Sequence, residues 1–115
     1  MEFLIDTGAD PTLLSPRDAQ RLGLNLEGLP AGPASTGVGG RTRTVVVDGV
    51  LVLHGRPFPL AVRVLDPPQE QSELFARVPS LLGRDILSQF ALFFEQRTGR
   101  VLLLTQEEAQ ALPLP

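Results

Sequence analysis

Two aspartates near the N-terminus have the spacing and the neighbours that carboxylate chemistry requires. Three apolar residues, 3–5, run directly into Asp6, and a second carboxylate, Asp10, follows after the small residues 7–9. The apolar run predicts a short buried strand, and the small residues predict a sharp loop. Burial of Asp6 would cost free energy unless a partner compensated, whereas a strand end presents a carboxylate for acid–base catalysis. The alternative is an Asx-turn, in which Asp6 only hydrogen-bonds its own loop.

The composition of the 115-residue chain excludes several other chemistries. There is no Cys and only one His, His54, which excludes disulfides, a thiol nucleophile, a zinc–thiolate site and a His-cluster metal site. The ten basic residues are all Arg, they form no basic block, and the net charge is −3, so a nucleic-acid surface is not indicated. We therefore expect no metal, no cofactor and no nucleic-acid partner.

Length and turn-forming residues favour a single domain over residues 1–115. Eleven Gly and eleven Pro argue for many turns and against a helical bundle. No apolar run reaches the roughly 20 residues of a membrane span, and the N-terminus lacks the pattern of a signal peptide. A cytoplasmic location is expected, unless an upstream segment carries a signal or an anchor.

A glycine-rich segment, Gly37-Val38-Gly39-Gly40, lies between two extended segments. A nucleotide-binding loop would have to open a helix whose N-terminus holds the phosphates, but the β-branched residues 42–47 follow instead. The segment is therefore predicted to be a mobile hairpin tip whose backbone can approach a ligand closely. Arg41 and Arg43 beside it hint at acidic substrate residues, although charges on an edge strand more often serve solubility.

The rest of the chain is predicted to be strands with short helices at defined points. Residues 42–65 are strand-like, and Asp48-Gly49 within them is either a hairpin turn or a bulge in one long strand. His54-Gly55-Arg56 is a second turn candidate. The polar residues 66–80 predict an exposed loop. Ser15 and Thr105 are predicted helix N-caps, and a hairpin is predicted for residues 91–104.

A second informative segment, residues 81–87, follows that loop. Leu81-Leu82 predicts a short buried strand, and Gly83 predicts a close backbone approach. From Arg84 onwards the pattern is helical, with three apolar side chains on one face: Ile86, Leu87 and Phe90.

In this order, the segments 3–10, 37–40 and 81–87 resemble the retropepsin-like aspartic proteases, as a bacterial-type single-lobe member. Asp-Thr-Gly alone is a weak signal, but the ordered set is fairly specific and covers the chain from residue 3 to about residue 104. The resemblance implies a mostly β, small closed or barrel-like acid-protease lobe with one or two short helices. It also implies a homodimer, a peptide or protein substrate and no cofactor.

The resemblance implies catalytic roles for Asp6, Thr7 and Gly8. Two Asp6 carboxylates across a two-fold axis would share a proton, since both cannot ionise cheaply. One would activate a water that attacks the peptide carbonyl, and the other would polarise the carbonyl oxygen. Thr7 would hydrogen-bond across the dimer axis, and Gly8 would leave space for the substrate backbone.

Other residues are implied to bind substrate or to support the site. The implied substrate-binding residues are Ala9, Asp10, Leu82 and a flap tip formed by Gly37, Val38, Gly39 and Gly40. Arg84 is expected to pair with Asp10 and brace the site together with Gly83. The implied enzyme is an aspartic endopeptidase that favours acidic to neutral pH and apolar residues at the scissile bond.

Only five residues precede Asp6, so the N-terminal strands of the lobe are expected to be missing or truncated. This favours an alternative, a catalytically silent domain of the same fold acting as a peptide-binding or dimerisation module. The intact Asp-Thr-Gly favours the enzyme. A further alternative is a small β-rich domain without a ligand, in which Asp6 only caps its loop.

Overall fold

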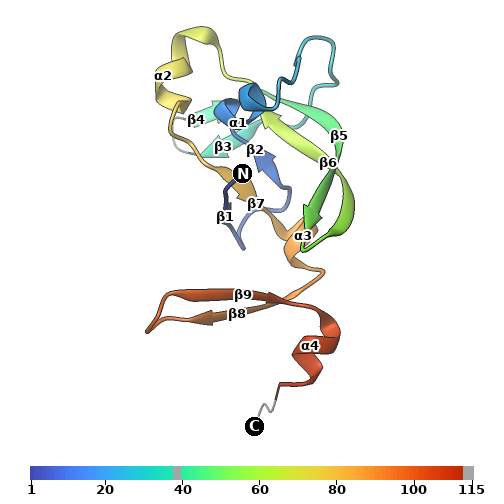
Figure 1. Cartoon of the computed structure of the whole chain (residues 1–115). Coiled ribbons are helices and arrows are strands. Elements are labelled where there is room, and N and C mark those ends of the chain that lie inside the picture. The colour runs from blue at the N-terminus through green and yellow to red at the C-terminus, as the bar shows by residue number, and fades with distance from the viewer. Residues whose placement is uncertain (38–39, 113–115) are drawn as a thin grey trace.

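A computed structural model describes residues 1–37 and 40–112, so the predicted flap-tip residues Val38 and Gly39 lie outside the described residues. Its main layer is a five-stranded sheet with the strand order β1-β7-β2-β6-β5 (Figure 1). The strands of this sheet are β1 (Phe3–Ile5), β2 (Leu13–Leu14), β5 (Thr44–Leu53), β6 (Arg56–Leu65) and β7 (Ser80–Leu82). Two ribbons accompany the sheet: β3 (Ser35–Gly37) with β4 (Gly40–Thr42), and β8 (Ala91–Glu95) with β9 (Arg100–Leu104).

The predicted mostly β architecture is confirmed, but the closed or barrel-like lobe is not. The strands in the described part of the chain form an open sheet and two separate ribbons. The short helices also outnumber the one or two expected: α1 (Pro16–Arg21), η1 (Gln69–Gln71), α2 (Ser72–Phe75), α3 (Arg84–Leu87) and α4 (Gln106–Gln110). Two of them, η1 and α2, lie in the segment predicted to be a polar exposed loop. There Phe75, only 4 % exposed, anchors the segment in the core.

The longest pairing in the sheet is the hairpin of β5 and β6. Asp48 and Gly49 lie inside one continuous strand opposite Ala61 and Leu60, and the register is unbroken, so they form neither a turn nor a bulge. The chain reverses at His54 and Gly55, which both have positive φ, 50° and 76°. Two such residues suit a two-residue hairpin loop, which confirms the turn predicted there.

The helix caps predicted from the sequence are present. Ser15 accepts a hydrogen bond from the backbone N–H of Asp18 at the start of α1, and Thr105 and Glu108 form a reciprocal capping box at the start of α4. The hydrogen bond from the Thr105 backbone N–H, followed by that of the Thr105 side chain, lowers the pKa of Glu108. No helix within residues 1–37 and 40–112 has the length and apolar character to span a membrane.

Parallel pairing brings together segments that are far apart in the sequence. β1 runs parallel to β7, with Ile5 opposite Leu82. Asp6 and Gly83, the residues that follow these strands, therefore leave the sheet at the same edge. This topology places the aspartate loop beside the start of α3.

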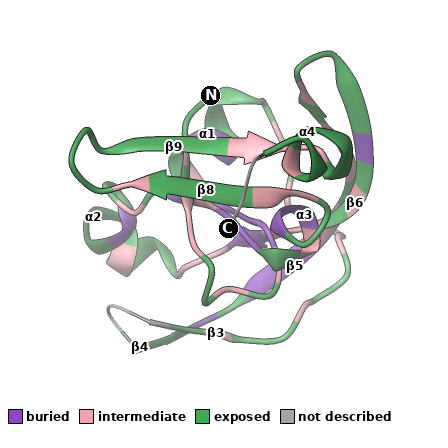
Figure 2. Cartoon of the chain, turned by 90° about the horizontal axis from the view of Figure 1, so that it is seen from below, coloured by how far each residue is buried: buried purple, intermediate pink, exposed green. Residues whose placement is uncertain are grey.

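The core lies on both faces of the sheet because neighbouring residues of one strand point to opposite faces. Leu14 packs with Ala19 of α1 on one face, whereas Leu13 packs with Phe75 of α2 on the other. β1 is less buried than predicted, since Leu4 is 56 % exposed. Figure 2 shows the largely exposed ribbon β8–β9 in front of the buried segments of the sheet.

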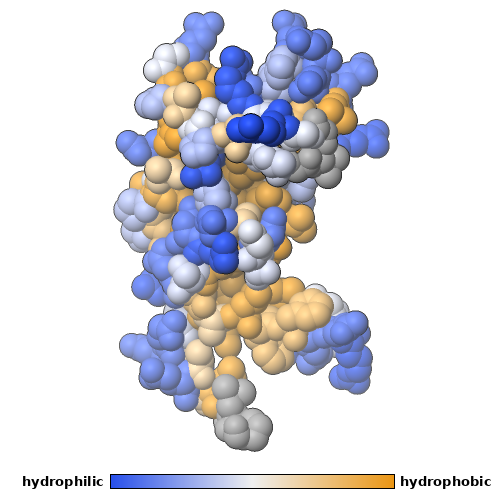
Figure 3. All heavy atoms as spheres, turned by 180° about the vertical axis from the view of Figure 1, so that it is seen from behind, coloured by the Kyte–Doolittle hydropathy of each residue, from blue (hydrophilic) through white to orange (hydrophobic). Residues whose placement is uncertain are grey.

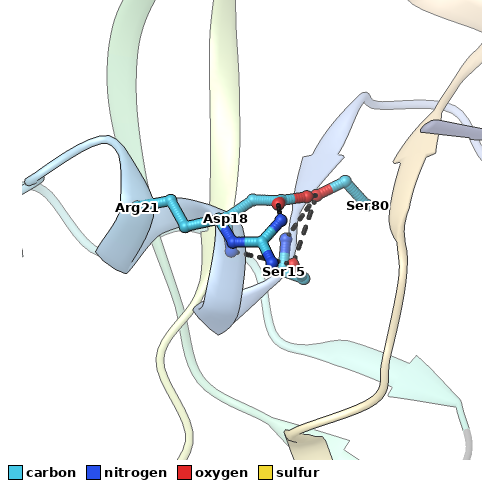
Figure 4. Close-up of polar contacts among 4 residues, drawn as sticks. All are labelled: Ser15, Asp18, Arg21 and Ser80. Atoms are coloured by element: carbon cyan, nitrogen blue, oxygen red, sulfur yellow. Dashed lines mark hydrogen bonds and ion pairs between the residues drawn. The ribbon is translucent and has the colours of Figure 1, made fainter. Parts of the chain in front are cut away.

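A buried polar cluster ties α1 to β7 (Figure 4). The Ser80 hydroxyl donates to Asp18 Oδ2 at 2.6 Å and accepts from the Ser15 backbone N–H at 2.9 Å. Ser15 and Ser80 are 1 % exposed and Asp18 is 5 % exposed, while Arg21 Nη1 lies 3.9 Å from Asp18 Oδ1. Because the buried carboxylate is satisfied, the cluster stabilises the position at which β7 begins.

Replacing Asp18 should therefore destabilise the fold. Asp18→Ala removes the closer of the two acceptors of the buried Ser80 hydroxyl and leaves only Ser15 Oγ, at 3.3 Å, so we expect the free energy of unfolding to fall by about 2 kcal/mol. Urea denaturation followed by circular dichroism measures the change. The control, Glu27→Ala, removes an exposed carboxylate and should change stability by less than about 0.5 kcal/mol. Equal losses in both variants would contradict a structural role for the cluster.

Candidate active site

Asp6 is half-buried and is the first residue after β1. Its backbone N–H donates to the Leu82 carbonyl at 3.1 Å, and its Oδ1 accepts from the Gly8 N–H at 2.9 Å. The side chain thus makes the Asx-type contact with its own loop, and Oδ2 has no hydrogen bond among the described residues. The Asx-type contact considered as an alternative is therefore present, and it leaves one oxygen of the carboxylate available, so it does not exclude the predicted catalytic role.

The loop after Asp6 is fastened to the start of α3 by Thr12 and Asp85, which lie 73 residues apart in the sequence. Asp85 accepts hydrogen bonds from the Thr12 backbone N–H at 3.0 Å, from the Thr12 hydroxyl at 2.7 Å and from the Ile86 N–H at 2.9 Å. The Thr12 hydroxyl oxygen in turn accepts from the Gly83 N–H at 3.1 Å. This network fixes the distance between the aspartate loop and the helix.

The backbones of the two segments also touch directly. The Arg84 N–H donates to the Ala9 carbonyl at 2.8 Å, and the Asp85 N–H donates to the Asp10 carbonyl at 3.0 Å. A Cβ atom at Gly83 would lie 2.4 Å from the Pro11 carbonyl oxygen. Only glycine fits there without moving backbone, which confirms the close approach predicted for Gly83.

Asp6 faces a cleft that is divided into two adjoining pockets. The first, which we name the apolar pocket, has a volume of about 540 Å³. Beside Asp6 its walls are mainly apolar and include Leu4, Leu13, Leu65, Leu74, Phe75, Val78 and Leu81. A pocket of this kind suits a large apolar side chain.

The second pocket, which we name the Arg63 pocket, has a volume of about 310 Å³. Its lining residues are Asp6, Gly8, Ala9, Pro11, Leu13, Ala34, Ser35, Thr36, Arg63 and Leu81. It shares Asp6, Leu13, Leu81 and the β3 residues Ser35 and Thr36 with the apolar pocket, so the two are contiguous. The charged residues that line the cleft are Asp6, Arg63 and Arg77.

Comparison with known proteins assigns this arrangement to a family. Residues 1–86 match the family model described as aspartyl protease. The structure of the EIAV protease complexed with the inhibitor HBY-793 is similar, with 30 % sequence identity over 75 % of this chain and 72 % of that chain and a TM-score of 0.56. The chain belongs to the retropepsin-like aspartic protease family.

Two further solved structures are similar to this lobe. A retropepsin-like aspartic protease from Rickettsia conorii shares 25 % identity over 89 % of this chain and 78 % of that chain, with a TM-score of 0.63. The retroviral protease-like domain of Ddi1 from Leishmania major shares 19 % identity over 87 % of this chain and 75 % of that chain, with a TM-score of 0.53, and so shares the fold. No curated protein sequence gives a significant match.

Several predicted site residues of the retropepsin-like lobe do lie at the cleft. Gly8 and Ala9 line the Arg63 pocket, and Gly40 lines the apolar pocket. Thr7 is exposed at the loop, and Gly37 ends β3. The catalytic and binding roles of these residues remain predictions.

Two of the predicted substrate-binding residues lie elsewhere. Leu82 packs into the core, 4 % exposed, and its neighbour Leu81 lines both pockets. The reason is strand alternation, because Leu82 lies on the same face of β7 as the buried Ser80. Asp10 is absent from the lining of both pockets and pairs with Arg84 instead.

The predicted ion pair between Asp10 and Arg84 is present. Its side chains are 81 % and 54 % exposed, however, and exposed pairs contribute little to stability. The partly buried contacts between Thr12 and Asp85 hold the loop more strongly. Sequence analysis missed them: Asp85 lies in the first turn of α3, but no local pattern points to Thr12 as its partner.

Two variants separate the contribution of the exposed ion pair to stability from that of the Thr12–Asp85 hydrogen bonds. Asp85→Ala leaves the Thr12 backbone and hydroxyl donors unpaired, so we expect a loss of about 3 kcal/mol in the free energy of unfolding. Arg84→Ala removes only the exposed pair and should cost less than about 1 kcal/mol. Urea denaturation of both variants measures the difference. A larger loss for Arg84→Ala would show that the exposed ion pair is the principal brace.

Proposed function

We propose that the protein is an aspartic endopeptidase whose active site forms when two copies of the chain each contribute Asp6. The observation that carries the proposal is the position of Asp6: it lies at a strand end, is oriented by the Gly8 N–H, and lines both pockets of the cleft. Membership of the retropepsin-like family supports it.

In the proposed reaction the two Asp6 side chains share one proton, because two carboxylates in contact do not both ionise. The ionised carboxylate takes a proton from water as the water oxygen attacks the peptide carbonyl carbon. The protonated carboxyl donates its proton to the carbonyl oxygen, which gives a tetrahedral diol. Collapse of the diol breaks the C–N bond as the protonated Asp6 carboxyl gives its proton to the leaving nitrogen and the ionised Asp6 carboxylate takes a proton from a diol hydroxyl, which restores the shared proton.

A single lobe supplies only half of this machinery. Among the described residues, Asp6 is the one carboxylate that lines the two pockets. Proposed roles for Thr7 across the two-fold axis and for residues 37–40 as a flap also require a second copy or a bound substrate. The proposed enzyme is therefore a homodimer that acts on a peptide or protein substrate.

The ribbon β8–β9 is the surface that we assign to the second copy. Figure 3 shows apolar residues gathered on the lower part of the molecule, where this ribbon lies. Five of its large apolar side chains are 37–59 % exposed: Leu92, Phe93, Phe94, Val101 and Leu102. A two-stranded ribbon is only marginally stable by itself, and an apolar surface of this kind marks an interface. Pairing two ribbons buries the same surface on both copies.

The proposal predicts that Asp6→Asn abolishes peptide cleavage. The variant keeps the size of the side chain and its hydrogen-bonding loop but cannot act as a base, so we expect an unchanged fold and at least a 10³-fold loss of kcat/KM. A mixed peptide library incubated between acidic and neutral pH and analysed by mass spectrometry measures cleavage. The matched control is Asp48→Asn on β5, away from the cleft. Binding of peptides without cleavage by the wild type would favour the silent module.

Mixing the two proteins tests whether the active unit is a dimer. At a fixed wild-type concentration, random pairing with an equal amount of Asp6→Asn should reduce activity to about one half, and a ninefold excess to about one tenth. The reason is that mixed dimers carry only one competent carboxylate. Initial rates of cleavage, measured after the two proteins have equilibrated, give the dependence of activity on the amount of added variant. Rates unaffected by the added variant would show that one chain acts alone.

A substitution in the ribbon β8–β9 tests the proposed interface. Phe94 is 59 % exposed, so Phe94→Asp should leave the isolated lobe folded but place a charge in the interface. We expect the dimer dissociation constant, measured by analytical ultracentrifugation, to rise by at least about 100-fold. Val52→Asp, which alters a residue 61 % exposed on β5, is the control and should leave it unchanged. Equal association of Phe94→Asp and wild type would exclude the ribbon as the interface.

A further inference from the structure

Arg63 projects from the face of β6 that borders the cleft. It lies opposite Leu13 of β2 in parallel register. Its strand neighbours Val62 and Val64 belong to the core on the other face, packed with Leu14. Alternation therefore places Arg63 on the same face as Leu13 and Leu65, both of which line the cleft.

The charge of Arg63 has no carboxylate partner within the described residues. The ion pairs there include Arg43 with Asp66, at 3.3 Å, and Arg84 with Asp10, but none that involves Arg63. Arg63 is half-buried and lines a pocket whose one acid, Asp6, is hydrogen-bonded to Gly8. A half-buried guanidinium presents up to five donors and is stabilised by a carboxylate that can accept two of them.

We propose that Arg63 determines substrate specificity by binding an acidic side chain in the Arg63 pocket. The substrate carboxylate accepts hydrogen bonds from the guanidinium, and the polar residues Ser35 and Thr36 of β3 contribute to the lining of the same pocket. An apolar side chain of the same substrate occupies the contiguous apolar pocket. The inference rests on the proposed function, because it assigns a ligand to the cleft of that site.

The charged residues near Arg63 also favour an acidic substrate side chain. Arg77, in the lining of the apolar pocket, is the other charged residue of the cleft besides Arg63 and Asp6. Arg41 lies on β4 beside the cleft residue Thr42 and is exposed. A cleft lined by two arginines and one acid, with Arg41 beside it, attracts acidic peptides and disfavours basic ones.

The test measures binding separately from cleavage. The full-length Asp6→Asn protein is titrated against fluorescein-labelled peptides with an apolar centre and Glu, Gln or Lys at one scanned flanking position. We expect the Glu peptide to bind about tenfold more tightly than the Gln peptide at one position, as a charge-assisted hydrogen bond does at the low end of its range. Arg63→Gln, added to Asp6→Asn, should bring this ratio to about one, and Arg63→Glu should shift the preference to Lys.

Arg56→Gln is the matched control, because it removes the same charge from the same strand outside both pockets, and it should retain the Glu preference. Equal binding of the Glu and Gln peptides with Arg63 in place would overturn the inference, and this comparison requires no Arg63 variant to fold. A Glu preference that persists in Arg63→Gln, or no binding of any peptide, would overturn it as well. A Glu preference that depends on Arg63, together with no cleavage by the Asp6-containing protein, supports the inference and rejects only the catalytic proposal.

Discussion

The position of the candidate catalytic carboxylate depends on one constraint, the close contact between the aspartate loop and the start of α3. β1 and β7 are three-residue strands, and their parallel pairing alone would not hold a loop in place. Gly83 allows the backbones to touch, and the hydrogen bonds between Thr12 and Asp85 hold them together. Without that contact the loop that carries Asp6 would lose its attachment to α3, and Asp6, Gly8, Ala9 and Pro11 would no longer form a fixed wall of the Arg63 pocket.

The same short strand, β7, is fixed at both ends by polar groups with satisfied hydrogen bonds. At its start Ser80 joins the buried cluster around Asp18, and just beyond its end Gly83 donates to the Thr12 hydroxyl. Between these ends Leu82 fills the core and Leu81 faces the cleft. Buried hydrogen bonds add specificity of position because an alternative register would leave their donors and acceptors unpaired. The polar contacts therefore position the cleft, while the apolar core supplies most of the stability.

Sequence analysis succeeded where the signal was local. The caps at Ser15 and Thr105 and the turn at His54-Gly55 follow from residue types a few positions apart. It failed where partners are distant in the sequence: Asp85 meets Thr12 because β2 pairs antiparallel with β7, and Arg63 borders the cleft because β6 pairs with β2. Leu82 rather than Leu81 was chosen as a cleft residue because the alternation of the strand was not followed from the buried Ser80. The prediction of a closed lobe was wrong because the sequence signals for strands do not specify whether a sheet closes.

The proposed dimer would explain two features of the lobe together, the exposed apolar ribbon and a cleft with a single carboxylate. A shared-proton mechanism requires two carboxylates. One lobe supplies only one of them, so the mechanism requires a second lobe. The chain also leaves Phe94 and its neighbours on β8 and β9 without cover. Burying that surface at a two-fold axis would supply free energy of association from apolar contact. Because the ribbon follows directly after α3, which braces the aspartate loop, an interface there would be coupled mechanically to the position of Asp6. In the proposed enzyme, assembly and the formation of the active site are therefore the same equilibrium.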